Sequence, residues 1–258
     1  MNNIINAKQI ADKEKIFREL NKKLTISYPL KEKYDIIIPP NIFQTWHTKF
    51  LPPQMSKAVN TIRILNPGFN YFLFDDNDCR EFIKTHFKPD VLDAYDRLVP
   101  GAYKADLWRY CVLFIHGGIY MDIKYTPLNG FKFINLTEKE HFVSDIDNVN
   151  IYNGLMVALP RNEILFKCIR RIVKNVENKF YGNGYLEPTG PALLSNFVST
   201  SENIVDLKHS VLNDNNYKLI YFNDIPILKS YNNHIEEREK YSKKKHYSIL
   251  WNERKIYM

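Results

Sequence analysis

The sequence contains few cysteines, and their spacing matches no metal site. Its three cysteines are Cys79, Cys111 and Cys168, none close enough to another to form a metal-binding pair. Two of them fall within the apolar patterns of predicted helices, where a free thiol behaves as a small hydrophobic side chain. The seven histidines are scattered, and none has the i, i+4 partner of a helical zinc site. A reducing compartment is therefore the simpler interpretation.

Long apolar segments are also absent from the sequence. No run approaches the ~18 apolar residues that a membrane-spanning helix needs. The first residues, MNNIINAKQIADKEKIF, carry charges where a signal peptide would need an apolar core. We therefore expect no transmembrane segment and a soluble protein in the cytoplasm of the producing cell, or in the host cytoplasm if the chain is viral.

Positive charge is in excess, with a formal net charge of +7 at pH 7. A basic protein can be a nucleic-acid binder. Much of this excess, however, lies in residues 1–33 and in the run Lys243–Lys245. A solvated surface explains that distribution, so we expect no nucleic-acid partner. A basic cleft would also suit a ligand that carries phosphate.

Strand-like and helix-like patterns alternate along much of the chain, which predicts a three-layer α/β fold. The apolar positions of residues 3–24 indicate an amphipathic helix. We therefore divide the chain into an N-terminal helical extension, residues 1–33, and one α/β domain, residues 34–258. The strands expected in that domain lie near residues 35–46, 69–76, 119–125, 141–146, 151–159, 217–222 and 224–229. The expected helices lie near residues 54–65, 78–86, 88–98, 102–115, 163–180 and 192–199.

The most informative segment is residues 102–125, which read AYKADLWRYCVLFIHGGIYMDIKY. Apolar residues at steps of mostly three and four predict a helix that ends at Gly117–Gly118. A short strand is expected to follow and to present Asp122 and Lys124 on the same face. Charged residues at the end of a buried strand mark a place where α/β proteins bind ligands. On spacing alone, however, an ordinary charged pair on a solvated strand is the favoured interpretation.

Two charged residues, Asp106 and Arg109, interrupt the apolar pattern of that helix. Because burial of an unpaired charge is costly, each must meet the other, a ligand or water. They lie one turn apart, so a helix salt bridge worth a few tenths of a kcal/mol is the alternative to a ligand-binding role. Trp46 and His246 allow similar alternatives. Trp46 is either a core residue or a platform for a nucleobase, and His246 is either a surface residue or a ligand.

Six segments occur in a characteristic order: IFQTW, NPG with FLFDD, KADLWRYCVLFIHGGIYMDIKY, YNGLMVALP, EPTGP and HYSILW. Together they resemble glycosyltransferase family 32, whose DXD-motif sugar transferases include yeast-type α-mannosyltransferases and share a core with glucosylating clostridial toxins. The resemblance covers roughly residues 36–258. It implies a GT-A type, Rossmann-like three-layer domain with a mixed central sheet. It also implies retaining transfer of a sugar from a UDP- or GDP-linked donor to a glycan, a protein or another hydroxyl acceptor.

The resemblance also implies roles for single residues. Trp46 would stack on the base of the nucleotide, and Asp122, the first aspartate of the DXD motif, would contact the ribose and a metal ion. Trp251 would contact the diphosphate. The implied catalytic residues are Asp106, Arg109 and Asp122; the implied donor-binding residues are Trp46, Asp106, Arg109, Tyr120, Asp122, Lys124, Asn153 and Trp251; and the implied metal ligands are Asp122 and His246.

The sequence departs from the family pattern at Lys124, where the motif usually has its second aspartate. The resemblance implies a divalent cation, Mn²⁺ by expectation, but a protonated lysine cannot ligate one and can instead neutralise a diphosphate as a point charge. Three alternatives stay open. The metal is held by Asp122 and His246 alone, the lysine substitutes for the metal, or the chain is a nucleotide-sugar-binding protein with impaired catalysis.

Overall fold

The structure is a computed structural model of the 258-residue chain. It describes residues 25–199, 203–212, 217–242 and 244–258. The helix predicted at residues 3–24 lies outside the described residues, so the division into an extension and a domain stays a prediction.

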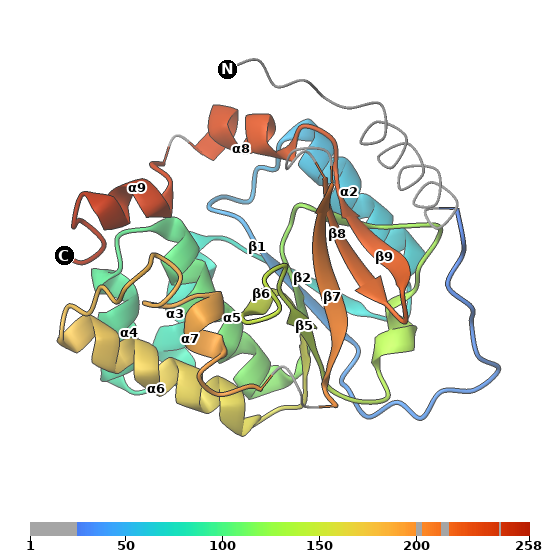
Figure 1. Ribbon diagram of the computed structural model, residues 1–258, viewed down its shortest axis with the longest axis horizontal. Helices are drawn as coiled ribbons and strands as arrows, with labels where there is room; N and C mark the ends of the chain where they lie inside the picture. Colours follow the sequence, from blue (N-terminus) through green and yellow to red (C-terminus); the bar gives the residue numbers. More distant parts are fainter. Residues whose placement is uncertain (1–24, 200–202, 213–216, 243) are drawn as a thin grey trace, which may run out of the picture.

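One mixed sheet, with helices on both faces, organises the described part of the chain (Figure 1). The strand order is β2-β1-β3-β6-β5-β7-β8-β9-β4. The strands are β1 (Asn41–Thr45), β2 (Asn70–Phe74), β3 (Gly118–Met121), β4 (Tyr125–Pro127), β5 (His141–Ser144), β6 (Ile151–Ala158), β7 (Val205–Leu212), β8 (Tyr217–Phe222) and β9 (Ile225–Ser230). The helices are α2 (Pro53–Leu65), α3 (Asp76–His86), α4 (Pro89–Arg97), α5 (Gly101–His116), α6 (Glu163–Glu177), α7 (Pro191–Leu194), α8 (His234–Ser242) and α9 (Tyr247–Asn252), with a 3₁₀ turn η1 at Phe133–Leu136.

The first three strands of the chain form a Rossmann-like unit. β1 pairs in parallel with β2 on one side and with β3 on the other, and helices α2 to α5 provide the crossovers. β6 then runs antiparallel to β3, and β5 pairs in parallel with β7. The predicted α/β class with a mixed central sheet is confirmed, and the parallel β2-β1-β3 unit agrees with the expected GT-A type.

The two faces of the sheet carry different clusters of apolar side chains, because successive residues of a strand point to opposite faces. In β3, Tyr120 packs with helices α3 to α6, whereas Ile119 and Met121 pack on the other face with Ile62 of α2. In Figure 1 α3 to α7 accordingly lie on one side of the sheet and α2 on the other. The layers predicted from the sequence are therefore present.

Helix α5 is enclosed by its neighbours rather than lying on the surface. Residues 106–113 are all buried, and the helix packs against α3, α4, α6 and the sheet. A helix that is buried on every side usually has apolar residues on every side. Asp106 and Arg109 are exceptions in α5, because their charged side chains are buried inside the protein. The predicted end of the helix is confirmed, because its last turn is followed by Gly117 and Gly118 with φ values of 61° and 110°.

The strand predicted from Ile119 to Tyr125 is shorter than expected. The Asp122 N–H donates to the Gly154 carbonyl at 2.8 Å. A turn follows directly, in which the Tyr125 N–H donates to the Asp122 carbonyl at 3.1 Å. The alternation of strand side chains therefore does not apply to Asp122 and Lys124. A turn, not a shared strand face, brings the two together.

The C-terminal part of the chain contains elements that the sequence patterns did not reveal. β7 joins β5 to β8, and helices α8 and α9 form in the C-terminal segment, for which the sequence predicted no helix. α8 buries only His234, and α9 is six residues long without a buried residue. Neither helix has the apolar stripe on which sequence-based recognition depends. Among the described residues, no helix has both the length and the apolar character to cross a membrane.

Gly118→Ala should lower the melting temperature, because β1 passes close to this residue. An added Cβ would lie 2.7 Å from the Asn41 carbonyl oxygen, at a φ of 110°. Strain of this kind costs about 1–3 kcal/mol before the clash is counted. Gly68→Ala is the matched control, because nothing lies within 4 Å of the Cβ added there. Thermal unfolding of both variants checks the prediction, and equal melting temperatures would contradict the close approach of β1 and β3.

Candidate functional site

A buried polar network lies where α5, β3 and β6 meet. Asp106 of α5 accepts hydrogen bonds from the Asn153 side-chain amide of β6 at 2.9 Å and from the Thr189 hydroxyl at 2.7 Å. The same amide also donates to the Tyr110 hydroxyl at 3.1 Å. All four residues are buried. The structure thus brings Asp106 and Asn153, both predicted site residues, into direct contact.

Thr189 and Tyr110 were not identified as site residues from the sequence. Thr189 belongs to the EPTGP segment, so its place in that segment was the available signal. Tyr110 carries no such signal, because an aromatic residue in an apolar helix pattern is typical of a core. Its hydroxyl meets the network only because Asn153 comes from a strand more than forty residues away in the chain.

Arg109 connects the two acidic residues of the site. Its guanidinium lies 3.3 Å from Asp106 Oδ1 and 3.4 Å from Asp122 Oδ1, and it donates to the Asn153 carbonyl at 2.8 Å. It also stacks over the Tyr120 ring at 4.4 Å. The helix salt bridge considered from the sequence is therefore present, but it is buried and extends beyond the helix to Asp122.

Asp122 accepts hydrogen bonds on both of its carboxylate oxygens. Oδ1 accepts from the Tyr120 hydroxyl at 2.8 Å and faces Arg109 at 3.4 Å. Oδ2 accepts from the Lys124 ammonium at 2.5 Å and from the Tyr152 hydroxyl at 3.2 Å. The turn after β3 makes the contact with Lys124 possible, since it folds the lysine back over the preceding aspartate. Asp122 is thus an anion surrounded by protein donors.

The two carboxyl groups differ in their electrostatic environment. Burial alone would raise the pKa of Asp122, but the positive charges of Lys124 and Arg109 outweigh it and hold the pKa below its ordinary value. For Asp106 burial is the larger effect, and its pKa is raised despite Arg109 and the hydrogen bond from Thr189. The site therefore has one firmly ionised carboxylate and one whose charge depends on the surrounding network.

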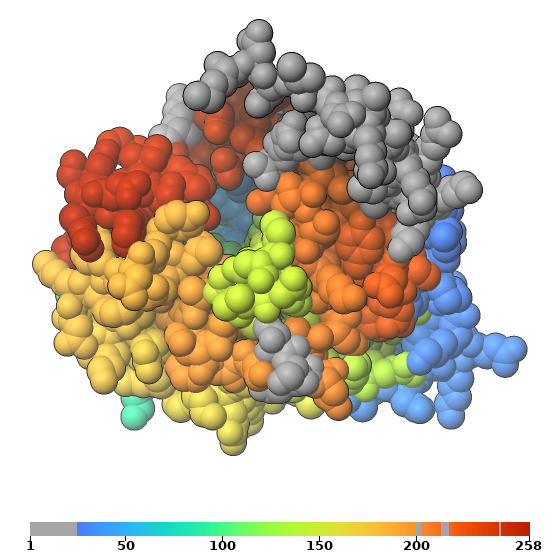
Figure 2. Space-filling view, in the orientation of Figure 1, coloured from blue at the N-terminus to red at the C-terminus, as the bar shows by residue number. Residues whose placement is uncertain are grey.

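Helix α9 covers the network from the C-terminal part of the chain. Tyr247 of α9 packs against Tyr103 of α5, with the ring centroids 5.9 Å apart, and burial is the main reason that the pKa of Tyr247 rises to about 12. Figure 2 shows a hollow between the C-terminal helices in red, the gold and orange chain after α6, and the orange strands β7 to β9.

Trp46 and Trp251 are partly buried, and Trp46 packs in a cluster that contains Ile123, the residue after Asp122. Trp46 follows β1 and packs against a small cluster that includes Met55 of α2 and Tyr231. Trp251 lies on α9, and its indole N–H donates to the Tyr181 carbonyl at 2.7 Å. Trp46 therefore contributes to packing, and its exposed part remains accessible for stacking on a nucleobase. The Trp251 indole N–H thus already has a protein partner, and the Arg254 guanidinium lies over its ring at 5.4 Å.

The residues present do not fit a divalent cation at Asp122. Both of its oxygens accept from protein donors, one of them an ammonium group, and ammonium and metal would compete for the same lone pairs. His246 caps α9, with Nδ1 2.7 Å from the Ser248 hydroxyl, and no contact among the described residues joins it to Asp122. Among the residues that the structure describes, no group of three or more His, Cys, Asp or Glu side chains could hold a metal ion.

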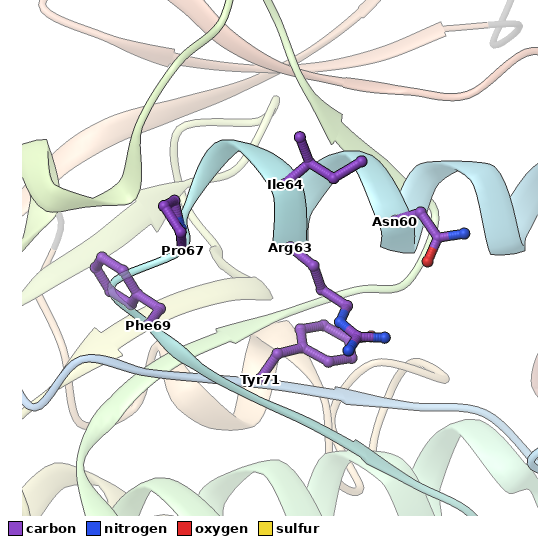
Figure 3. A pocket seen from close by; sticks show the side chains of 6 residues that line it. All are labelled: Asn60, Arg63, Ile64, Pro67, Phe69 and Tyr71. Atoms are coloured by element: carbon purple, nitrogen blue, oxygen red, sulfur yellow. The ribbon is translucent and has the colours of Figure 1, made fainter.

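Two other hollows lie on the outer side of the sheet and contain none of the predicted site residues. The one in Figure 3, of about 500 Å³, is lined by the end of α2 and the start of β2. Its guanidinium, Arg63, already lies over the Tyr71 ring at 5.7 Å. The other, of about 560 Å³, runs along β2 and α3. Neither offers the buried carboxylates of the α5–β3 network.

Comparison with known proteins identifies the segment that contains Asp106, Arg109 and Asp122. Residues 52–143 match the model of a glycosyltransferase sugar-binding region containing the DXD motif. An uncharacterized glycosyltransferase of Acanthamoeba polyphaga mimivirus is 37% identical over 89 residues, which are 34% of this chain and 36% of that protein. Inositol phosphoceramide mannosyltransferase 3 of Schizosaccharomyces pombe is 38% identical over 86 residues, 33% of this chain and 24% of that protein.

Longer matches are less similar. Mannosyl phosphorylinositol ceramide synthase of Saccharomyces cerevisiae is 27% identical over 172 residues, 62% of this chain and 41% of that protein. Among solved structures, the PaToxG glycosyltransferase superposes with a TM-score of 0.49 at 20% identity, over 73% of this chain and 77% of that one. The chain spans less than half the length of these three relatives. The family resemblance predicted from the sequence is confirmed: residues 52–143, with α5 and Asp122, match the sugar-binding region of the DXD-motif glycosyltransferases.

Proposed function

We propose that this chain is a glycosyltransferase that moves a sugar from a nucleoside-diphosphate sugar to a hydroxyl group of a glycan or another acceptor, with retention at the anomeric carbon. The observation that supports this most directly is the buried Asp106–Arg109–Asp122 network. It lies within the segment that matches the sugar-binding region, residues 52–143. Residues held this firmly are suited to fixing a polar ligand in one orientation.

In this proposal the sugar hydroxyls of the donor meet Asp106 and Arg109, and the ribose meets Asp122. A carboxylate that stays ionised is a good acceptor for two neighbouring hydroxyl groups. Trp46 stacks on the base, and Asn153 and Trp251 complete the donor site. These roles follow from the family resemblance, and the contacts among Asp106, Arg109, Asp122 and Asn153 are compatible with them.

The chemical demand on the site comes from the leaving group. The bond between the anomeric carbon and a phosphate oxygen breaks, and negative charge builds up on the diphosphate while the sugar becomes oxocarbenium-like. Cations placed before the reaction stabilise that charge without reorganisation. A same-face attack, in which the leaving phosphate oxygen accepts the proton of the acceptor hydroxyl, needs no protein nucleophile.

Mannose is the first sugar to test, since two of the relatives described above are named for mannosyl transfer to inositol-containing ceramides. Whether the nucleotide is UDP or GDP is open within the proposal. A second candidate function is sugar-nucleotide binding without catalysis, which Lys124 favours because it stands at the second aspartate of the motif. Hydrolysis of the donor in the absence of acceptor separates the two, since a binding protein would show none.

The isolated protein should bind at least one nucleoside-diphosphate sugar, because the network and Trp46 together form a donor site. Calorimetric titration with GDP-mannose, UDP-glucose, UDP-galactose and UDP-N-acetylglucosamine measures this. Asp122→Ala should weaken the binding, whereas Asp224→Ala, at an exposed residue of the β8–β9 turn, should leave it unchanged. A folded sample that binds none of the four donors would contradict the proposed function.

Arg109 should have separable effects on folding and on donor binding. Arg109→Ala leaves two buried carboxylates without their shared cation, so we expect a loss of about 3–5 kcal/mol in the free energy of unfolding. Arg109→Lys keeps the charge and should retain much of that stability, but it loses the guanidinium fork and should weaken donor binding. The control is Arg170→Ala, which breaks an exposed pair with Asp90 and should cost at most about 1 kcal/mol.

Chemical denaturation and donor titration of the three variants check these expectations. If Arg109→Ala unfolded like the wild type, the guanidinium would not be holding the two carboxylates. If Arg109→Lys were as stable as the wild type and bound donor equally well, Arg109 would have no part in the donor site.

A further inference from the structure

Two cations that the sequence analysis did not single out lie near Lys124. Lys218 is on β8, and its backbone N–H donates to the Ser230 hydroxyl of β9 at 3.0 Å. Ser230 in turn pairs with Tyr125 of β4, the residue after Lys124. Strand pairing therefore brings Lys218 within two strands of the turn that carries Asp122, although nearly a hundred residues separate them in the chain.

The side chain of Lys218 projects from the same face of the sheet as Tyr125, because strand pairing aligns Lys218 with Ser230 and Ser230 with Tyr125. Ile220, two residues further along the same strand, projects to the same face and packs in the apolar cluster that also contains Tyr125 and Tyr152. The hydroxyl groups of these two tyrosines are 3.1 Å apart, and the Tyr152 hydroxyl donates to Asp122. The Lys124 ammonium lies over both rings, at 5.2 and 5.6 Å.

Arg238 approaches the same place from helix α8. Its neighbour Glu237 accepts from the backbone N–H groups of Gln54 and Met55 and so fixes α8 against the start of α2. Burial and then the charge of Arg238 lower the pKa of His246 on α9. The same arginine acts on Lys218. In Figure 1 α8, which carries Arg238, lies between the end of β9 and helix α9.

The ammonium group of Lys218 has no ion-pair or hydrogen-bond partner among the described residues. Burial is the main reason that its pKa falls to about 8, and the positive charges of Lys124 and Arg238 lower it further, against the charge of Asp122. A half-buried cation without an anion is unfavourable. Arg238 has only an exposed contact of 3.7 Å with Glu239.

Among the described residues, the acidic side chains near Lys124 are already paired with other groups. Asp122 is shared by Lys124 and Arg109, and Asp145 bonds to His209 at 2.8 Å. The imidazoles nearby add no charge at neutral pH, because burial lowers the pKa of both His209 and His234, the latter to about 4. Within the part of the chain that the structure describes, Lys218 is therefore left without an ion-pair partner, and Arg238 has one exposed contact, with Glu239.

We propose that Lys124, Lys218 and Arg238 form a cation cluster that binds the diphosphate of the donor and takes the part that a divalent cation would otherwise have. This inference rests on the proposed function for the identity of the ligand. A nucleoside-diphosphate sugar carries a negative charge on each phosphate, and lysine and arginine are the side chains that neutralise phosphates. The diphosphate follows the ribose in the donor, so a cluster next to Asp122 is where it would lie.

The cluster also suits the chemical step. The bond from the anomeric carbon to the phosphate oxygen breaks with its electron pair remaining on that oxygen, and the acceptor oxygen forms the new bond to the same carbon. The acceptor's proton passes to the leaving phosphate oxygen, so the products are the glycoside and the nucleoside diphosphate. Lys218 and Arg238 offset the charge that the leaving group gains, without a change in their own protonation.

The test uses the full chain in the presence of a chelator. Wild type, Lys218→Gln, Lys218→Arg and Arg238→Gln are titrated with UDP, GDP, inorganic pyrophosphate, uridine and guanosine. We expect wild type to bind a nucleoside diphosphate without metal, Lys218→Gln and Arg238→Gln to bind it about tenfold or more weakly, and Lys218→Arg to bind it nearly normally. Binding of the nucleoside should not change, since it lacks phosphate.

Lys208→Gln is the matched control, because Lys208 is an exposed lysine of β7 that pairs with Asp224. It should bind every probe as the wild type does. Lys218→Gln should also keep or raise the melting temperature, because it removes a half-buried, uncompensated charge. A loss of diphosphate binding without a loss of stability would therefore exclude a general effect on folding.

The remaining outcomes distinguish the cluster from the proposed function. Nucleoside diphosphate binding that requires Mn²⁺ and is unchanged in Lys218→Gln would overturn the inference. Pyrophosphate binding that depends on Lys218, without binding of any nucleotide, would support the cluster and contradict the donor function. Binding of glycerol 3-phosphate to the protein saturated with nucleoside diphosphate, lost in Lys218→Gln, would assign the cluster to a phosphate of the acceptor and overturn its assignment to the donor.

Discussion

The site depends on one guanidinium group shared by two carboxylates, the buried Asp106 and the partly buried Asp122. Asp106 and Asp122 come from different elements, and without a cation between them their charges would repel in a region from which water is largely excluded. Arg109 lies within 3.4 Å of an oxygen of each. Its helix is enclosed by three other helices and the sheet, so the guanidinium has little freedom to move. The packing that holds α5 in the core therefore also fixes the geometry of the site.

Lys124 changes the chemistry of this arrangement from that of a DXD motif. An aspartate there would add a second oxygen ligand next to Asp122, whereas the lysine adds a cation that occupies one of the Asp122 oxygens. The negative charge of Asp122 is then balanced by protein groups alone. Lys218 and Arg238 extend the positive charge to the side where α8 and α9 cover the hollow. A site of this kind stabilises a leaving diphosphate through fixed side chains.

The part of the site that could be predicted from the sequence is the part encoded locally. The apolar periodicity of residues 102–115 and the two glycines after it define α5 and its end, and both predictions are confirmed. The contact between Asp122 and Lys124 was expected for the wrong reason, since a turn and not strand alternation produces it. Sequence spacing describes regular elements well, but it does not show where a strand gives way to a turn.

The residues that the sequence did not reveal are those that long-range pairing brings to the site. Thr189 reaches Asp106 from a loop, and Lys218 reaches Lys124 through the pairing of β8, β9 and β4. No local pattern distinguishes Lys218 from the many surface lysines of a basic chain. Helices α8 and α9 were missed because neither has a continuous apolar face, and their contribution is to enclose the hollow.

The central claim is that side-chain cations, not a metal ion, balance the charge at Asp122. It is tested most directly by measuring donor turnover, as transfer or hydrolysis, over a Mn²⁺ titration with a chelator control, for wild type, Lys124→Asp and Lys124→Ala. We predict that wild type stays active in chelator, that Lys124→Asp becomes dependent on Mn²⁺, and that Lys124→Ala is slower with or without metal. Complete loss of wild-type turnover on chelation, with Lys124→Ala indistinguishable from wild type, would contradict the account.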